Sequence, residues 1–160
     1  MSVTEAPVAA ADRLRESLAT TGQAVVFGAW GTGKTTLLRE FARQAEERGE
    51  RVLCLTAYRG DAERPYAVLT QLAAQLRDAE VDALPEEMRH VVRALLSRSP
   101  LEHVPPRPEA VRSALTAVLG RLRNALLTLD DVQWADDESA EALAHQLHTL
   151  PPGAVRAIVA

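Results

Sequence analysis

The chain has 160 residues, of which 47% are hydrophobic and 25% are charged, as expected for a soluble globular domain. Its formal net charge of −4 excludes a bulk electrostatic attraction to nucleic acid or to an acidic membrane surface. A single cysteine, Cys54, excludes an internal disulfide, and its apolar neighbours predict that it is a small buried side chain.

The apolar pattern in the first part of the chain predicts that strands and helices alternate. Short apolar, β-branched runs predict buried strands, and Gly22 and Gly49 mark the natural ends of two helical segments. In chain order we expect a loose leader at 1–10, a helix at 11–20, a strand at 24–27, a helix at 35–48 and a strand at 51–56. No secretory signal is visible and no apolar run reaches the roughly 18 residues of a membrane span, so we expect a cytoplasmic protein.

Three helical segments follow, each with a proline near its start, where the missing N–H costs nothing. We expect these helices at 65–78, 85–98 and 108–123. The last part of the chain predicts a third strand at 125–129, a helix that begins at the cap Asp136 and runs to about residue 148, and a fourth strand at 154–160. The alternation predicts an α/β fold in three layers, with a parallel sheet of about four strands.

A glycine-rich loop joins the first strand to the helix that follows it. Residues 28–36 read Gly-Ala-Trp-Gly-Thr-Gly-Lys-Thr-Thr and contain the full Walker A pattern. Glycines let the backbone curl so that successive N–H groups point at phosphate oxygens, and the start of the helix adds its positive dipole end. The pattern therefore predicts a P-loop NTPase fold. The residues expected to bind the nucleotide are Gly28, Gly31, Thr32, Gly33, Lys34, Thr35 and Thr36.

Lys34 is the only lysine among the 18 basic residues of the chain. A P-loop needs a compact ammonium that reaches terminal phosphate oxygens, and the bulkier guanidinium fork of arginine does not replace it. We expect Lys34 to bind the β and γ phosphates of ATP and to serve in catalysis. The Thr35 hydroxyl is expected to ligate Mg²⁺ and Thr36 to contact the α phosphate, while Trp30 is expected to be a surface residue.

A second acidic motif ends the third strand. The run Leu126-Leu127-Thr128-Leu129-Asp130-Asp131 is typical of a Walker B strand, which delivers a carboxylate to the edge of the sheet where ligands bind. Asp130 is expected to hold Mg²⁺ opposite Thr35, and Asp131 is the candidate catalytic acid that orients the attacking water. Because the strand at 51–56 intervenes in the chain, we expect another strand to separate the Walker B strand from the P-loop strand.

The segment Leu129-Asp130-Asp131-Val132-Gln133-Trp134-Ala135-Asp136 resembles the extended Walker B motif of the STAND-type ATPases, and within them that of the large ATP-binding regulators of the LuxR family. The segment 64–69, Arg-Pro-Tyr-Ala-Val-Leu, resembles the Pro-Tyr segment of the same family. The resemblance implies an AAA-like domain that uses ATP binding, with slow or absent hydrolysis, as a switch in transcription regulation. It assigns no role to Trp134 or Asp136, and we expect the Trp134 indole to pack against the following helix.

The resemblance also implies a strand order. The fourth strand is expected between the P-loop strand and the Walker B strand, with the P-loop strand at an uncovered apolar edge. Regulators of this family are much longer and carry a fifth strand and further domains. We therefore expect residues 11–160 to form an ATPase domain that is incomplete at its C-terminus and belongs to a larger regulator.

Two other functions fit the same motifs. The chain could be a non-catalytic fragment that associates with itself or with a larger partner, or a small-molecule kinase on the same fold, although no arginine-rich lid is visible. The expected ligands are ATP or ADP with Mg²⁺, with no direct nucleic-acid binding. His145 and His148 are expected on a solvated helix face, and Arg59 and Arg64 are expected to be solvated.

Overall fold

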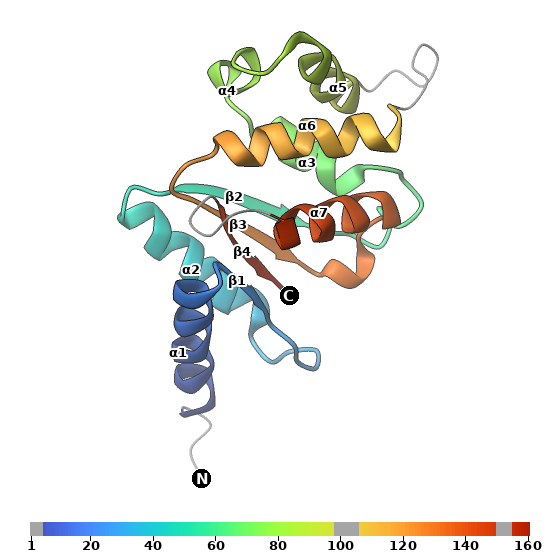
Figure 1. Cartoon of the computed structure of the whole chain (residues 1–160). Helices are drawn as coiled ribbons and strands as arrows, with labels where there is room; N and C mark the ends of the chain where they lie inside the picture. The colour runs from blue at the N-terminus through green and yellow to red at the C-terminus, as the bar shows by residue number, and fades with distance from the viewer. Residues whose placement is uncertain (1–4, 98–105, 150–154) are drawn as a thin grey trace.

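A computed structural model describes residues 5–97, 106–149 and 155–160 (Figure 1). Four strands form one sheet in which every neighbouring pair is parallel. The strands are β1 (Gln23–Val25), β2 (Arg51–Thr56), β3 (Ala125–Asp130) and β4 (Val155–Val159). The sheet confirms the predicted α/β fold with four parallel strands.

The strand order is β1-β4-β3-β2, so β4 separates the P-loop strand from the Walker B strand as predicted. The register aligns Val25 with Val159, Val159 with Leu129, and Leu129 with Leu55. The carboxyl ends of all four strands therefore lie at one edge of the sheet. Ligands of open parallel sheets bind at this edge.

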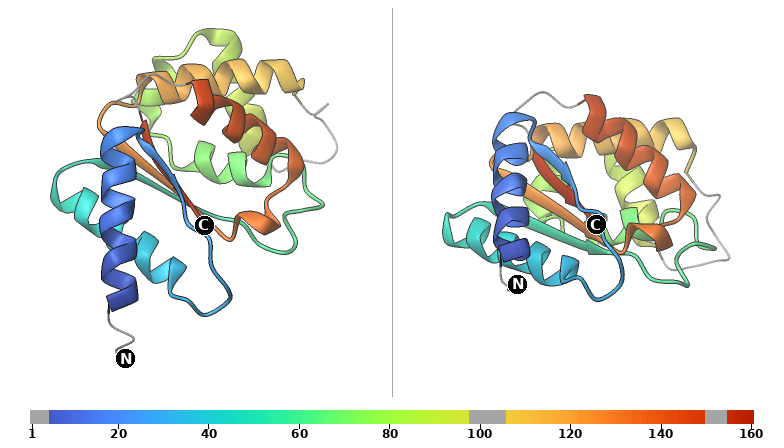
Figure 2. Two further views of the ribbon diagram at one scale, coloured as in Figure 1. Left: turned by 60° about the horizontal axis from the view of Figure 1, so that its bottom comes forward. Right: turned by 90° about the horizontal axis from the view of Figure 1, so that it is seen from below.

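Helices cover both faces of the sheet and complete the predicted three layers (Figures 1 and 2). One face carries α1 (Glu5–Thr20) and α2 (Lys34–Glu47), and the other carries α3 (Ala67–Ala74), α6 (Pro108–Arg121) and α7 (Asp137–Thr149). Two further helices, α4 (Asp78–Asp82) and α5 (Glu86–Leu96), pack on α3 and α6 away from the sheet. None of the helices in the described ranges is long and apolar enough to cross a membrane.

The two faces of β3 point into separate apolar cores. Leu126 packs with Leu38, Phe41 and other residues of α1 and α2, whereas Leu127 and Leu129 belong to the larger core under α3, α6 and α7. Every residue of β3 is buried, because a strand flanks it on each side and helices cover both faces. The motif that ends β3 is therefore attached to the most completely buried strand of the sheet.

Two helix predictions need correction. The helix predicted at 65–78 ends at Ala74, and α4 is a separate element. Just after α3, the Gln75 side chain forms hydrogen bonds with the backbone of β2. The backbone N–H of Arg77 donates to the Glu80 carboxylate at 2.7 Å and so caps the start of α4. The first helix begins at Glu5 and not at residue 11. The other helices agree with their predicted bounds within two residues.

Both edge strands are more exposed than predicted. Cys54 was predicted to be buried, but Leu53 and Leu55 point into the core, so Cys54 between them points to the opposite face of the edge strand β2 and is exposed. The P-loop strand spans Gln23–Val25 and is not a buried strand, because Val25 is 58% exposed. Its place at the sheet edge confirms the expected strand order.

Candidate functional site

The glycine-rich loop leads from β1 into α2 at the carboxyl edge of the sheet (Figure 1). Gly31 and Gly33 adopt φ values of +76° and +83°, which lie in the left-handed region that side chains disfavour. At Gly28 a Cβ atom would lie 2.8 Å from the Thr32 hydroxyl, so a side chain there requires this hydroxyl to move. These three glycines therefore shape the loop by conformation and by close approach.

The N-terminus of α2 has the character of an anion site. Gly33 is its N-cap residue, no side chain caps the first turn, and no acidic residue lies in that turn. The first backbone N–H groups of a helix have no partner within the helix, and the helix dipole makes this end positive. The half-buried Thr35 and the exposed Thr36 begin this helix beside Lys34.

Lys34 folds back over the loop that precedes it. Its ammonium donates hydrogen bonds to the backbone oxygens of Gly28 at 2.9 Å and Ala29 at 3.2 Å, while the Thr32 hydroxyl donates to the Ala29 oxygen at 2.8 Å. The cation thus lies over the same loop whose glycines give it its shape. Trp30, in the middle of the loop, is 87% exposed, as predicted.

Asp130 ends β3 at the same edge of the sheet. It is 8% exposed, its Oδ1 accepts a hydrogen bond of 3.0 Å from the backbone N–H of Asp131, and it pairs in register with Thr56. One strand, β4, lies between β3 and β1. With strands about 4.8 Å apart, the ends of β1 and β3 are separated by roughly 10 Å. The sheet therefore places the acidic strand end near the P-loop, as the sequence predicts.

Asp131 adopts a left-handed backbone conformation, with φ of 56°. The backbone N–H of Trp134 donates to the Asp131 oxygen at 2.9 Å and closes the short helical turn η1 (Val132–Trp134). The Asp131 Oδ1 accepts a hydrogen bond of 2.9 Å from the Gln133 amide. The candidate catalytic acid is half-buried and held by its own turn.

Trp134 packs half-buried against the larger core. The Arg59 guanidinium lies 4.6 Å from the centroid of its ring, a cation–π arrangement that sequence reasoning missed. Arg59 is exposed as predicted, and Arg64, also exposed, lies 3.6 Å from the Asp61 carboxylate. His145 and His148 are both exposed on α7, as predicted.

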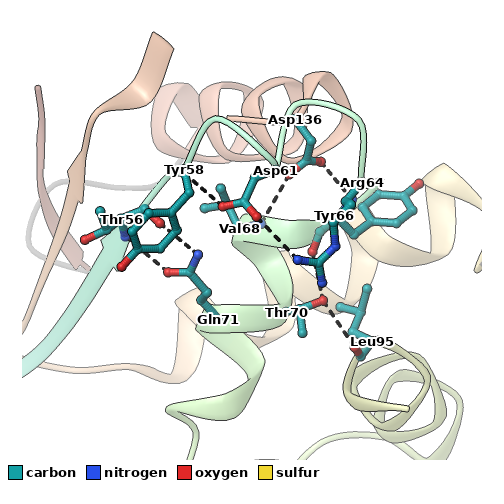
Figure 3. Close-up of polar contacts among 10 residues, drawn as sticks. All are labelled: Thr56, Tyr58, Asp61, Arg64, Tyr66, Val68, Thr70, Gln71, Leu95 and Asp136. Carbon is teal, nitrogen blue, oxygen red and sulfur yellow. Dashed lines mark hydrogen bonds and ion pairs between the residues drawn. The ribbon is translucent and has the colours of Figure 1, made fainter. Parts of the chain in front are cut away.

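Asp136 has a structural role that the sequence motif did not reveal (Figure 3). Its carboxylate is fully buried and accepts hydrogen bonds from the backbone N–H groups of Tyr66 at 2.7 Å, Val68 at 3.2 Å and Ser139 at 2.9 Å. It caps α7 as predicted, and it also binds the start of α3. The two motifs that suggested the family resemblance, at 64–69 and 129–136, therefore meet at this carboxylate.

A parallel sheet with a glycine-rich loop at the start of α2 and an acidic strand end across β4 defines a P-loop NTPase-like fold. A family model described as the AAA ATPase domain matches residues 8–159, and the chain belongs to that family. No curated protein and no solved structure gives a significant match. Membership of the family indicates a nucleotide-binding ATPase domain, which commonly works with Mg²⁺.

Proposed function

We propose that this chain binds Mg-ATP at the P-loop and acts as a nucleotide-dependent switch in a cytoplasmic transcription regulator of the STAND type, with slow or absent hydrolysis. The observation that supports it most is the Lys34 ammonium, which lies over the carbonyl oxygens of Gly28 and Ala29 at the uncapped start of α2. Because its partners there are neutral carbonyls, a polyphosphate is the stronger acceptor for this cation.

The proposed binding roles follow from position. Lys34 leaves the loop carbonyls to bind the β and γ phosphates, and Gly28, Gly31, Thr32, Gly33 and Thr36 line the phosphates through the loop and the helix start. Oxygen ligands suit Mg²⁺, and the Thr35 hydroxyl and the Asp130 carboxylate are the groups offered at this edge. When bound, the ion neutralises charge on the phosphates.

The proposed switch depends on the segment that follows β3. Residues 130–136 begin at the proposed Mg²⁺ ligand and end at Asp136, which holds the first turns of α3 and α7. A change in structure at Asp130 between the ATP-bound and ADP-bound states would therefore reach α3 and α7 through this short turn. A ligand shifts a conformational equilibrium only by its differential affinity for the two states.

The test compares the protein with Mg-ATPγS, with Mg-ADP and without nucleotide by hydrogen exchange, with phosphate release measured in parallel. The proposal predicts nucleotide-dependent protection in the P-loop and a difference between the two nucleotides in residues 131–139 and 64–70. Equal protection by both nucleotides in those segments would rule out the switch while leaving nucleotide binding intact.

A second function has support from the β1 edge. Val25 and Phe27 are 58% and 89% exposed at the end of the edge strand, beside the exposed Trp30. An apolar strand edge favours association with another segment or chain. Sedimentation of the chain without nucleotide, compared with a Val25→Lys variant, distinguishes an associating fragment from a monomeric ATPase. A kinase function has no comparable support.

A further inference from the structure

The turn after the Walker B strand holds Asp131 in a defined backbone conformation. Asp131 is a non-glycine residue at φ of 56° and ψ of 39°. Such conformations persist where the surroundings determine them, and they cluster at functional sites. The backbone N–H of Asp131 donates to the Asp130 carboxylate at 3.0 Å, and its oxygen accepts from the N–H of Trp134 at 2.9 Å.

The residues on both sides of Gln133, Val132 and Trp134, are held by contacts with other parts of the fold. The backbone N–H of Val132 donates to the Ala160 oxygen at 2.9 Å, and the Trp134 indole packs on the core under the Arg59 guanidinium. The backbone of Gln133 is therefore fixed while its side chain is exposed. The fixed backbone removes the main-chain part of the entropic cost of directing this side chain at a neighbouring group, and the rotamer freedom of the glutamine remains to be offset by the bond it makes.

The Gln133 amide is directed at the Asp131 carboxylate. Its Nε2 donates to Oδ1 at 2.9 Å, the one side-chain hydrogen bond that Asp131 makes among the described residues. A single neutral donor on one oxygen restrains the carboxylate and leaves the second oxygen to accept a proton from water. An arginine in this place would occupy both oxygens in a bidentate pair.

We propose that Gln133 is a positioning residue for ATP hydrolysis, an inference that rests on the proposed function of this site. A water oxygen forms a bond to the γ phosphorus, and the bond from that phosphorus to the β–γ bridging oxygen breaks, leaving its electron pair on ADP. Asp131 Oδ2 takes the proton of the water and later releases it to solvent. Gln133 holds Oδ1 so that Oδ2 faces the water.

The experiment measures the steady-state turnover of Mg-ATP by the whole chain together with nucleotide binding. Gln133→Met keeps the side-chain length and removes the donor, Gln133→Glu keeps the shape and replaces the donor by a like charge, and Gln133→Asn keeps an amide. We expect kcat to fall about tenfold in the Met variant and further in the Glu variant, with an unchanged KM for ATP, because misplacing a catalytic group lowers turnover and not binding. The Asn variant should recover much of the loss.

Gln44→Met is the matched control. Gln44 Nε2 donates to the Glu40 carboxylate at 2.6 Å on α2, so this variant removes the same kind of bond away from the turn, and its kcat should equal that of the wild type. Wild-type turnover in the Gln133→Met variant, or equal losses in the Met and Asn variants, would overturn the inference. A wild-type chain that binds Mg-ATP without hydrolysing it would also overturn it, while the proposed nucleotide switch would stand. A chain that does not bind Mg-ATP would overturn both.

Discussion

The buried carboxylate of Asp136 accepts a hydrogen bond of 2.7 Å from the backbone N–H of Tyr66, a residue 70 positions earlier in the chain. Tyr66 adopts a left-handed conformation with φ of 62°, and it is the N-cap residue of α3 without a capping side chain of its own. Asp136 supplies that cap from the segment that follows β3. Ser139 strengthens the junction, because its hydroxyl accepts from the N–H of Leu69 at 3.1 Å.

Asp136→Ala should be among the most destabilising single changes in the chain. It leaves the backbone N–H groups of Tyr66, Val68 and Ser139 without their acceptor, and a buried unsatisfied group costs about 1–3 kcal/mol. We expect a loss of about 3–5 kcal/mol in the free energy of unfolding, measured with urea. Asp136→Asn keeps Oδ1, which accepts two of the three bonds, and should cost about 1–2 kcal/mol. Equal costs for the two variants would contradict the account of the carboxylate as a shared cap.

Gly28→Ala tests whether close packing inside the P-loop is needed for nucleotide binding. The new methyl group would meet the Thr32 hydroxyl at 2.8 Å, so this hydroxyl must move and its bond to the Ala29 oxygen is disturbed, and ATP affinity should fall by about tenfold in calorimetric titration. Gly22→Ala is the control, since it introduces a side chain at a φ of +75° with open space around it and away from the loop. It should lower stability by about 1–2 kcal/mol and leave affinity unchanged. The double variant Gly28→Ala, Thr32→Ala should regain part of the affinity, and no gain would argue against the steric explanation.

Gln71 in α3 and Gln75 directly after it pair with the outer edge of β2. Gln75 exchanges hydrogen bonds with the backbone of Cys54 at 3.0 and 2.8 Å, and Gln71 does the same with Thr56 at 3.1 and 2.8 Å. The amide side chains thus occupy the donors and acceptors that a further strand would use.

The double variant Gln71→Met, Gln75→Met should open this edge. We expect a loss of about 1–3 kcal/mol in stability and a concentration-dependent increase in mass by light scattering. Gln44→Met, which removes one part-buried side-chain bond on α2, should stay monomeric to the same extent as the wild type. If the double variant does not associate more than the control, the glutamines do not protect the edge.

Glu50 makes the free energy of unfolding depend on pH. Burial raises the pKa of this carboxyl, but hydrogen bonds from Arg48, at 2.7 Å, and from Arg156 outweigh it and hold the pKa below its usual value. A lowered folded-state pKa stabilises the fold at pH values above the unfolded-state pKa, near 4.3, and this contribution is lost as the pH falls through the folded-state value.

Glu50→Gln should therefore cost about 1–3 kcal/mol at pH 7, and the difference from the wild type should shrink as the pH falls below about 4 and vanish only below the lowered folded-state pKa. Unfolding by urea across this pH range provides the measurement. Glu46→Gln is the control at an exposed position of α2 and should remain within about 0.5 kcal/mol of the wild type throughout. A Glu50→Gln deficit that persists undiminished in acid would mean that the ion pairs are not its source.

The strands and the position of the phosphate loop could be predicted from local pattern, because apolar runs define the strands and the glycine-rich sequence defines the loop. The strand order, with β4 between β1 and β3, was implied by the family resemblance. The sheet register then brought Lys34 and Asp130 to one edge, as the motifs require.

The failures have a common cause in contacts that are distant in sequence. Cys54 lies in an apolar run, yet its strand is an edge whose outer backbone is paired by Gln75. α3 ends at Ala74 and α4 begins at Asp78, where the apolar periodicity alone continues one helix. The role of Asp136 depends on partners about 70 residues away, which no local pattern reveals.

The central claim is a working Mg-ATP site at Lys34, and thermal unfolding tests it most directly. Mg-ATP at about 100 times its dissociation constant should add about 2.7 kcal/mol of stability, which corresponds to a rise of very roughly 5–10 °C in the melting temperature. The account predicts this rise in the wild type and none in Lys34→Ala, with equal melting of the two proteins in the absence of nucleotide within about 2 °C. A cooperative melt that Mg-ATP leaves unchanged, or an equal rise in the variant, would contradict it.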